Sequence, residues 1–155
     1  MKLRIVGAIL AIASFCLASA QEKQQKQTCA VVITDPHNGD SVQADGSVTG
    51  TATVPPGTHL WIFAHRRGLG LWWPQGGGSP QITDKGKWEA LVTYGTPRDV
   101  GNDFEITTAV VADEDNNHLF NWVKKAEATG QYPGIRLPAS VEGCPTPRVV
   151  VKKTE

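Results

Sequence analysis

The sequence predicts a mainly β fold, an antiparallel β-sandwich of about seven strands with one inserted helix. Short apolar or alternating segments recur along the chain, separated by clusters of Gly, Pro, Asn and Asp, as in all-β domains. Only the segment after residue 112 carries apolar residues at helical spacing. The 155 residues suffice for one domain with one core.

The first half of the chain contains four strand-like segments. Residues 30–34 (AVVIT) are a β-branched run, and residues 41–44 are a short continuation after a turn. Residues 47–53 alternate small polar and apolar side chains, as a half-buried strand does. Residues 60–64 (LWIFA) are an unbroken apolar run, which predicts a central strand buried on both faces.

The second half adds further strands. We expect a short edge strand at residues 81–83 and a strand at 87–94 with alternate apolar residues on one face. Residues 103–112 form a strong strand whose outward face becomes apolar towards its end, so this face requires a cover. Residues 148–152 are the last strand.

A helix is predicted to provide that cover. Acidic residues 113–115 favour a helix start, and apolar residues follow at i, i+3, i+4 and i+7: Leu119, Trp122, Val123 and Ala126. Gly130 fits the left-handed position that ends a helix. Residues 131–138 contain two prolines and are predicted to form an extended lid across one end of the sandwich.

The N-terminus predicts export. Residues 1–20 combine two basic residues, an apolar run and small residues before a cleavage site after Ala20, as a signal peptide does. The apolar run has about 13 residues where a membrane-spanning helix needs about 20, so no membrane insertion of the mature chain is expected. Polar residues 21–28 predict a disordered leader, and residues 29–153 the folded domain. The protein is expected to be periplasmic or secreted.

Cysteine usage agrees with an exported chain. Cys16 lies in the signal segment, and a lipid anchor there is disfavoured because Phe15 occupies a position that requires a small residue. Cys29 and Cys144 remain as an even pair, which predicts a disulfide in an oxidising compartment; two free thiols are the alternative. The first and last strands follow these cysteines closely, so we expect the two strands to lie parallel, side by side.

Charge excludes one class of partner. The chain has 15 basic and 15 acidic residues, and removal of the signal segment leaves 13 against 15, a net charge of −2. Nucleic acid binding requires a basic face, which this composition does not provide. The predicted partner is a protein or glycan of the cell envelope, and the chain is expected to be a monomer.

Residues 33–36 (ITDP), 48–52 (VTGTA) and 60–62 (LWI) carry a family resemblance. This pattern resembles the opening half of bacterial immunoglobulin-like domains of exported proteins. The resemblance implies a β-sandwich, and implies adhesion, carbohydrate binding, inhibition or spacing as functions, because such sandwiches serve all of these. The inserted helix departs from the usual plan of the family, so the resemblance extends only to the fold.

The loop at residues 65–78 is the predicted binding site. It carries two cations, two indoles and an amide: Arg66, Arg67, Trp72, Trp73 and Gln75. Such groups dominate protein interfaces, which favours a partner protein. The alternative is a carbohydrate-binding module in which Trp72 or Trp73 stacks on a sugar ring. Adjacent residues of an extended segment point in opposite directions, so we expect one indole inside and one outside, with burial of both as the competing interpretation.

Catalysis is not predicted. The sequence lacks the nucleophile and metalloprotease motifs, and its histidines show no metal-ligand spacing. Acidic residues 113–115 could bind calcium, but they lack the spacing of a known calcium loop and are explained as helix-start acids. We therefore expect a non-enzymatic chain with no cofactor and no metal.

Overall fold

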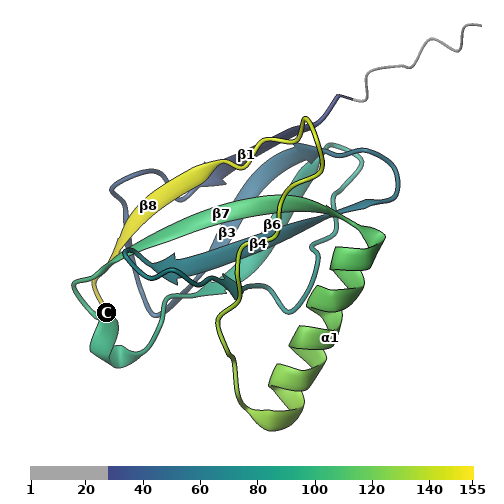
Figure 1. Cartoon of the computed structure of the whole chain (residues 1–155). Helices are drawn as coiled ribbons and strands as arrows, with labels where there is room; N and C mark the ends of the chain where they lie inside the picture. Colours follow the sequence, from purple (N-terminus) through teal and green to yellow (C-terminus); the bar gives the residue numbers. More distant parts are fainter. Residues whose placement is uncertain (1–27) are drawn as a thin grey trace, which may run out of the picture.

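The computed structural model describes residues 28–155, which form two β-sheets and one α-helix (Figure 1). The smaller sheet has three strands in the order β1-β3-β6. Its strands are β1 (Ala30–Asp35), β3 (Asp45–Thr53) and β6 (Lys87–Thr93). The predicted signal peptide and most of the predicted leader lie outside the described residues.

The larger sheet has five strands in the order β2-β8-β7-β4-β5. In that order they span Ser41–Val42, Arg148–Lys153, Asp103–Ala112, Thr58–Arg66 and Trp73–Pro74. Helix α1 (Asp113–Thr129) follows β7 directly, and a short 3₁₀ helix, η1 (Pro97–Asp99), precedes β7. The prediction of a mainly β fold with one helix is therefore confirmed.

Strand β4 is buried on both faces, as its unbroken apolar run predicts, and it lies between β7 and the short edge strand β5. It pairs antiparallel with β7 over nine residues, from Thr58 opposite Ala112 to Arg66 opposite Phe104. Side chains alternate between the two faces of a strand. Leu60, Ile62 and Ala64 therefore enter one core, whereas Trp61 and Phe63 enter another.

The first core lies between the two sheets. Strand β6 contributes alternate buried residues and exposes the residues between them, the pattern of a strand with one face in water. The buried members of this core include Val48, Trp88, Val92, Ile106 and Val151.

The second core lies between the outer face of the five-stranded sheet and α1. Leu119 and Val123 of α1 pack against Trp61, Phe63 and Val111 of the sheet, and Ala126 is also buried. Figure 1 shows α1 lying against one side of the five-stranded sheet. The helix ends at Gly130, which has φ 66° in the left-handed region, as expected.

The segment 131–147 crosses the outer face of the five-stranded sheet without regular structure (Figure 1). It is tied to the sheet by reciprocal backbone hydrogen bonds between Trp72 and Ile135, and by the bond from Val141 N to Val110 O. The expected lack of regular structure at residues 131–138 is confirmed apart from this bridge, but the segment lies across a face of the sheet and not across one end of the sandwich. The predicted edge strand at 81–83 is wrong, because these residues have no regular secondary structure.

The disulfide Cys29–Cys144 is present, with the two Cα atoms 5.0 Å apart. The expected pairing of the first and last strands is wrong. Strand β1 pairs only with β3 in the small sheet, whereas β8 pairs with β7 and, in parallel, with β2. The disulfide therefore connects the chain before β1 to the crossing segment before β8, and so links the two sheets.

No helix among residues 28–155 has the length and apolar character needed to cross a membrane.

Candidate functional site

The predicted binding loop is short and well anchored at both ends. It leaves β4 through a turn in which Leu69 N donates to Arg66 O, and Arg67 N donates to Asp103 O. It then forms β5, where Trp73 lies opposite Ala64 of β4. Because β5 adds a strand to the sheet edge, the directions of the two indoles are fixed by backbone pairing rather than by the loop itself.

Trp72 points inwards and is only 6% exposed. Its ring stacks on that of His65 with a centroid distance of 3.7 Å, and the Arg148 guanidinium lies over the same indole at 5.4 Å. These neighbours cover the ring. The expectation of one buried indole is therefore confirmed, and Trp72 is the buried one, so it offers no flat face for sugar stacking.

A polar cluster holds Trp72 in place. One ring nitrogen of the buried His65 lies 3.2 Å from Leu71 O, and the other lies 3.4 Å from Glu105 Oε2. Arg148 donates to Glu105 Oε1 at 2.6 Å. Burial raises the pKa of Glu105, but the hydrogen bonds from Arg148 and His65 and the charge of Arg148 outweigh it, so the pKa of Glu105 lies below its ordinary value.

The lowered pKa of Glu105 predicts a pH-dependent contribution to stability. Because the pKa is lower in the folded state, the contribution is fully present above the ordinary value of 4.5 and is lost as the pH falls through the folded value. Glu105→Gln should lower the free energy of unfolding by about 1–2 kcal/mol at neutral pH. Urea titrations at neutral pH and in acid measure this difference in unfolding free energy between the variant and the wild type, which should be smaller in acid. A difference of equal size at both pH values would contradict the assignment.

Trp73 points outwards and is partly exposed. Its indole Nε1 donates to Tyr132 O at 2.8 Å, and Trp122 Nε1 donates to the next carbonyl, Pro133 O, at 3.1 Å. The Trp122 and Tyr132 rings meet edge to face at 6.1 Å. Two indoles from different elements thus fix the same short stretch of the crossing segment.

Exposed apolar side chains surround these rings. Leu71 is 43% and Tyr132 54% exposed, and Leu71 and Trp73 both lie so close to Gly134 that a Cβ there would approach them within 3 Å. We name the surface formed by Leu71, Trp73, Trp122 and Tyr132 the aromatic patch. Exposed Leu69 adjoins it in sequence.

Of the remaining predicted site residues, Arg66 and Gln75 make contacts within the protein, and Arg67 is exposed. Arg66 pairs with Asp99 at 3.2 Å, whereas Arg67 is exposed and makes no ion pair within residues 28–155. Hydrogen bonds from the Thr96 backbone and hydroxyl, and the nearby charge of Arg66, lower the pKa of Asp99 despite its burial. Gln75 is structural, because its side chain accepts from Thr93 N of β6 and donates to Trp73 O.

Comparison with known proteins assigns no family to this chain. No protein-family model matches it, and no curated protein matches it either. Its function must therefore be inferred from the arrangement of its own side chains.

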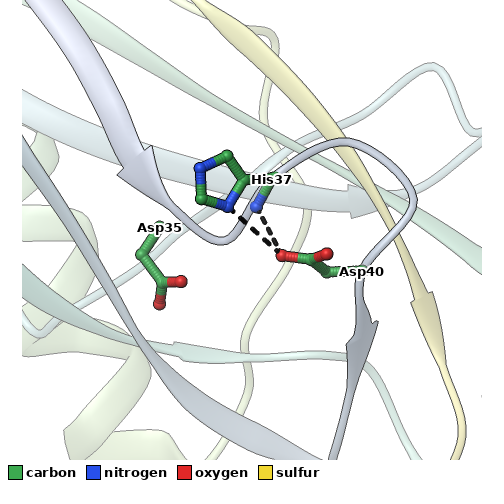
Figure 2. Close-up of side chains that lie close together, drawn as sticks. All are labelled: Asp35, His37 and Asp40. Atoms are coloured by element: carbon green, nitrogen blue, oxygen red, sulfur yellow. Dashed lines mark hydrogen bonds and ion pairs between the residues drawn. The ribbon is translucent and has the colours of Figure 1, made fainter.

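A second cluster of polar groups lies in the turn after β1. Figure 2 shows Asp35, His37 and Asp40, whose possible ligand atoms all lie within 4.8 Å of one another. All three residues are exposed, and Asp40 Oδ2 already accepts a hydrogen bond from His37 N at 2.7 Å and lies 3.6 Å from His37 Nδ1. These contacts between His37 and Asp40 close the turn, and Asp35 takes no part in them.

The acidic start of α1 is also engaged. Asp113 Oδ1 lies 2.7 Å from His59 Nε2, so the start of the helix is tied to the start of β4. Asn116, one turn later, accepts a hydrogen bond from Trp61 Nε1 at 2.9 Å. The acidic residues 113–115 predicted the helix start, but no pattern in the sequence indicated the contact of Asn116 with Trp61.

Proposed function

We propose that this chain is an exported, non-catalytic binding module that recognises a partner protein through the aromatic patch. The observation that carries this proposal is the exposure of Leu71 and Tyr132 beside two indoles that are held rigid by their own hydrogen bonds. Clusters of aromatic side chains with a central apolar surface are typical of interface hot spots.

Rigidity supports this role. The N–H groups of Trp73 and Trp122 are both used internally, so the exposed parts of these rings are apolar and already ordered. A binding surface that is ordered before association loses less conformational entropy on binding, which leaves more of the contact energy for affinity. The patch also rests on the sheet and on α1, so a partner would meet a fixed surface.

A partner protein fits this patch better than a glycan. Sugar rings stack on open, flat aromatic faces, but of the two indoles in the loop Trp72 is covered by His65 and Arg148, and Trp73 is only partly exposed. The exposed Leu71 and Leu69 add aliphatic surface, which suits apolar side chains of a protein and offers no hydrogen bonds to hydroxyl groups. The loop also carries Arg67, which makes no ion pair with any residue from 28 to 155, and this favours a partner with acidic residues around an apolar centre.

We also infer an immunoglobulin-like arrangement of the two sheets. In immunoglobulin domains one sheet carries strands A, B and E and the other carries G, F and C. The order β1-β3-β6 corresponds to A-B-E, and β8-β7-β4 corresponds to G-F-C. In this assignment α1 and the crossing segment, residues 131–147, lie between strands F and G. The aromatic patch combines residues of this connection with residues of the loop that follows strand C. The disulfide supports export to an oxidising compartment.

The proposal predicts that Leu71→Ser combined with Tyr132→Ser weakens partner binding. Immobilised wild-type protein should retain a partner from an extract of its native source, and purified partner should then bind the double variant at least about tenfold more weakly, because a buried hot-spot side chain contributes about 1.4 kcal/mol or more. Arg67→Glu should also weaken binding, with a stronger effect at low salt.

Leu91→Ser provides the matched control. Leu91 is 59% exposed on the outer face of β6, in the other sheet, so its replacement removes a similar exposed apolar side chain away from the patch. It should bind the partner as the wild type does. Equal binding of partner by the wild type and the patch variant would exclude the patch as the contact surface.

A further inference from the structure

A hollow of about 340 Å³ lies at the start of α1, where β4 begins, and it is separate from the aromatic patch. It is bounded by β4, by the loop 79–82 and by the first turns of α1. Trp73 and the patch lie near the other end of β4, opposite Ala64. Its size is at the lower end of the range for small-molecule sites, about 300–1,000 Å³.

The side-chain amide of Asn116 lines this hollow; among residues 28–155 its oxygen has a hydrogen-bond partner, but its nitrogen has none. Asn116 is 7% exposed, and its Oδ1 accepts from Trp61 Nε1. No residue of the range 28–155 accepts a hydrogen bond from its Nδ2, and the side chain lines the hollow. Nδ2 is not one of the fully buried unpaired polar atoms of residues 28–155, so it meets solvent and can donate to an acceptor that enters the hollow.

The walls combine aromatic, aliphatic and uncharged polar groups. Phe120 lies one turn after Asn116 on the same side of α1, where it meets Trp61 edge to face at 5.4 Å. Ile82 and Pro80 add apolar surface, and Ser79 and Gln81 add groups that both donate and accept.

Charge narrows the class of ligand. No Lys or Arg lines the hollow, and the carboxylate of Asp113 stands beside it, paired with His59. An anion would therefore find no cation and would be repelled. An ammonium group cannot accept a hydrogen bond from Asn116 Nδ2. A hydroxyl group can accept from Nδ2 and can also donate to the other polar walls.

We propose that this hollow binds a neutral, hydroxyl-rich ring, that is, a sugar. A hydroxyl oxygen of the ring accepts from Asn116 Nδ2, its neighbours bond to the polar walls, and its apolar face contacts Phe120. The site is independent of the partner-binding role of the aromatic patch.

The test is a titration of the oxidised protein with glucose, galactose, mannose and N-acetylglucosamine, followed by NMR of the Asn116 side-chain amide and the Trp61 indole N–H. At least one neutral sugar should shift both signals saturably, with a dissociation constant on the order of 1 mM, a value for a small, open site. Glucuronic acid should bind several-fold more weakly, because the hollow has no cation for its carboxylate. No saturable shift with any neutral sugar, or tighter binding of glucuronic acid, overturns the proposal.

Two variants test whether the sugar binds in the hollow. Asn116→Asp retains an acceptor for Trp61 but removes the Nδ2 donor, so it should weaken sugar binding at least about tenfold. If this variant does not fold, His59→Ala takes its place, because the His59 side chain is one-third exposed and lines the hollow. It should weaken binding as well. Tyr132→Ser, in the patch, should bind sugar as the wild type does. Wild-type affinity in both hollow variants overturns the proposal.

Discussion

Replacing both Cys29 and Cys144 by serine is expected to lower the free energy of unfolding by about 4 kcal/mol, the largest effect on stability that we predict. The disulfide closes a loop with a sequence separation of 115 residues. The chain-entropy description gives about 5 kcal/mol for a loop of this length, and measured values usually fall below it. For a domain of this size the midpoint of thermal unfolding should fall by about 15 °C.

Reductant provides the control for this prediction. The wild type in reductant should unfold at the same urea concentration as the double serine variant, because both lack the covalent link. The variant itself should not respond to reductant. A wild type whose unfolding is unchanged by reductant, with both thiols shown to be free, would contradict the predicted contribution of the link.

The disulfide also shows what local sequence predicts and what it does not. The pairing followed from an even number of cysteines in a chain that the sequence predicts to be exported. The expected side-by-side placement of the first and last strands did not follow, because it depends on which sheet each strand joins. Strand β2, only two residues long, takes the place beside β8 that was expected for β1.

Long periodic segments were predicted well. The apolar run of β4, the alternating pattern of β7 and the i, i+3, i+4, i+7 pattern of α1 each depend on neighbouring residues alone. Strand β5 was missed, because its two residues become a strand only by pairing with Phe63 and Ala64. Such pairing has no signal in the sequence of the short strand itself.

The candidate site was predicted in part for the same reason. Trp72 and Trp73 are adjacent, so one inside and one outside was expected, but which one points inwards is set by the pairing of β5 with β4. Tyr132 and Trp122 were missed as site residues because they come from the crossing segment and from α1. The hydrogen bond from Trp73 to Tyr132 spans 59 residues of sequence, and the bond from Trp122 to Pro133 spans 11, distances over which local patterns carry no information. A tyrosine beside Pro133 in a non-regular segment was the one available signal.

Gly50→Ala is expected to destabilise the protein by about 3 kcal/mol or more, through close packing that no sequence pattern revealed. Gly50 lies in β3 opposite Trp88 of β6. A Cβ at this position would lie 2.1 Å from Val32 O and 2.3 Å from Trp88 Cζ2. The first neighbour is backbone of β1, and the second is an indole that is 3% exposed, so neither can move without disturbing the sheet or the core. Overpacking of this kind costs about 1–3 kcal/mol, and more where backbone must shift.

Gly46→Ala separates this steric effect from a general effect of alanine in the strand. Gly46 lies four residues earlier in β3, and the nearest atom to a Cβ there is Tyr94 Cε2 at 3.8 Å, an ordinary contact. Because alanine has less conformational freedom than glycine in the unfolded chain, Gly46→Ala should leave stability unchanged or raise it slightly. Urea titrations of both variants measure the difference. If Gly50→Ala were as stable as Gly46→Ala, β1, β3 and the Trp88 indole could not pack as closely as the structure places them, and the alignment of the three-stranded sheet would be wrong at its centre.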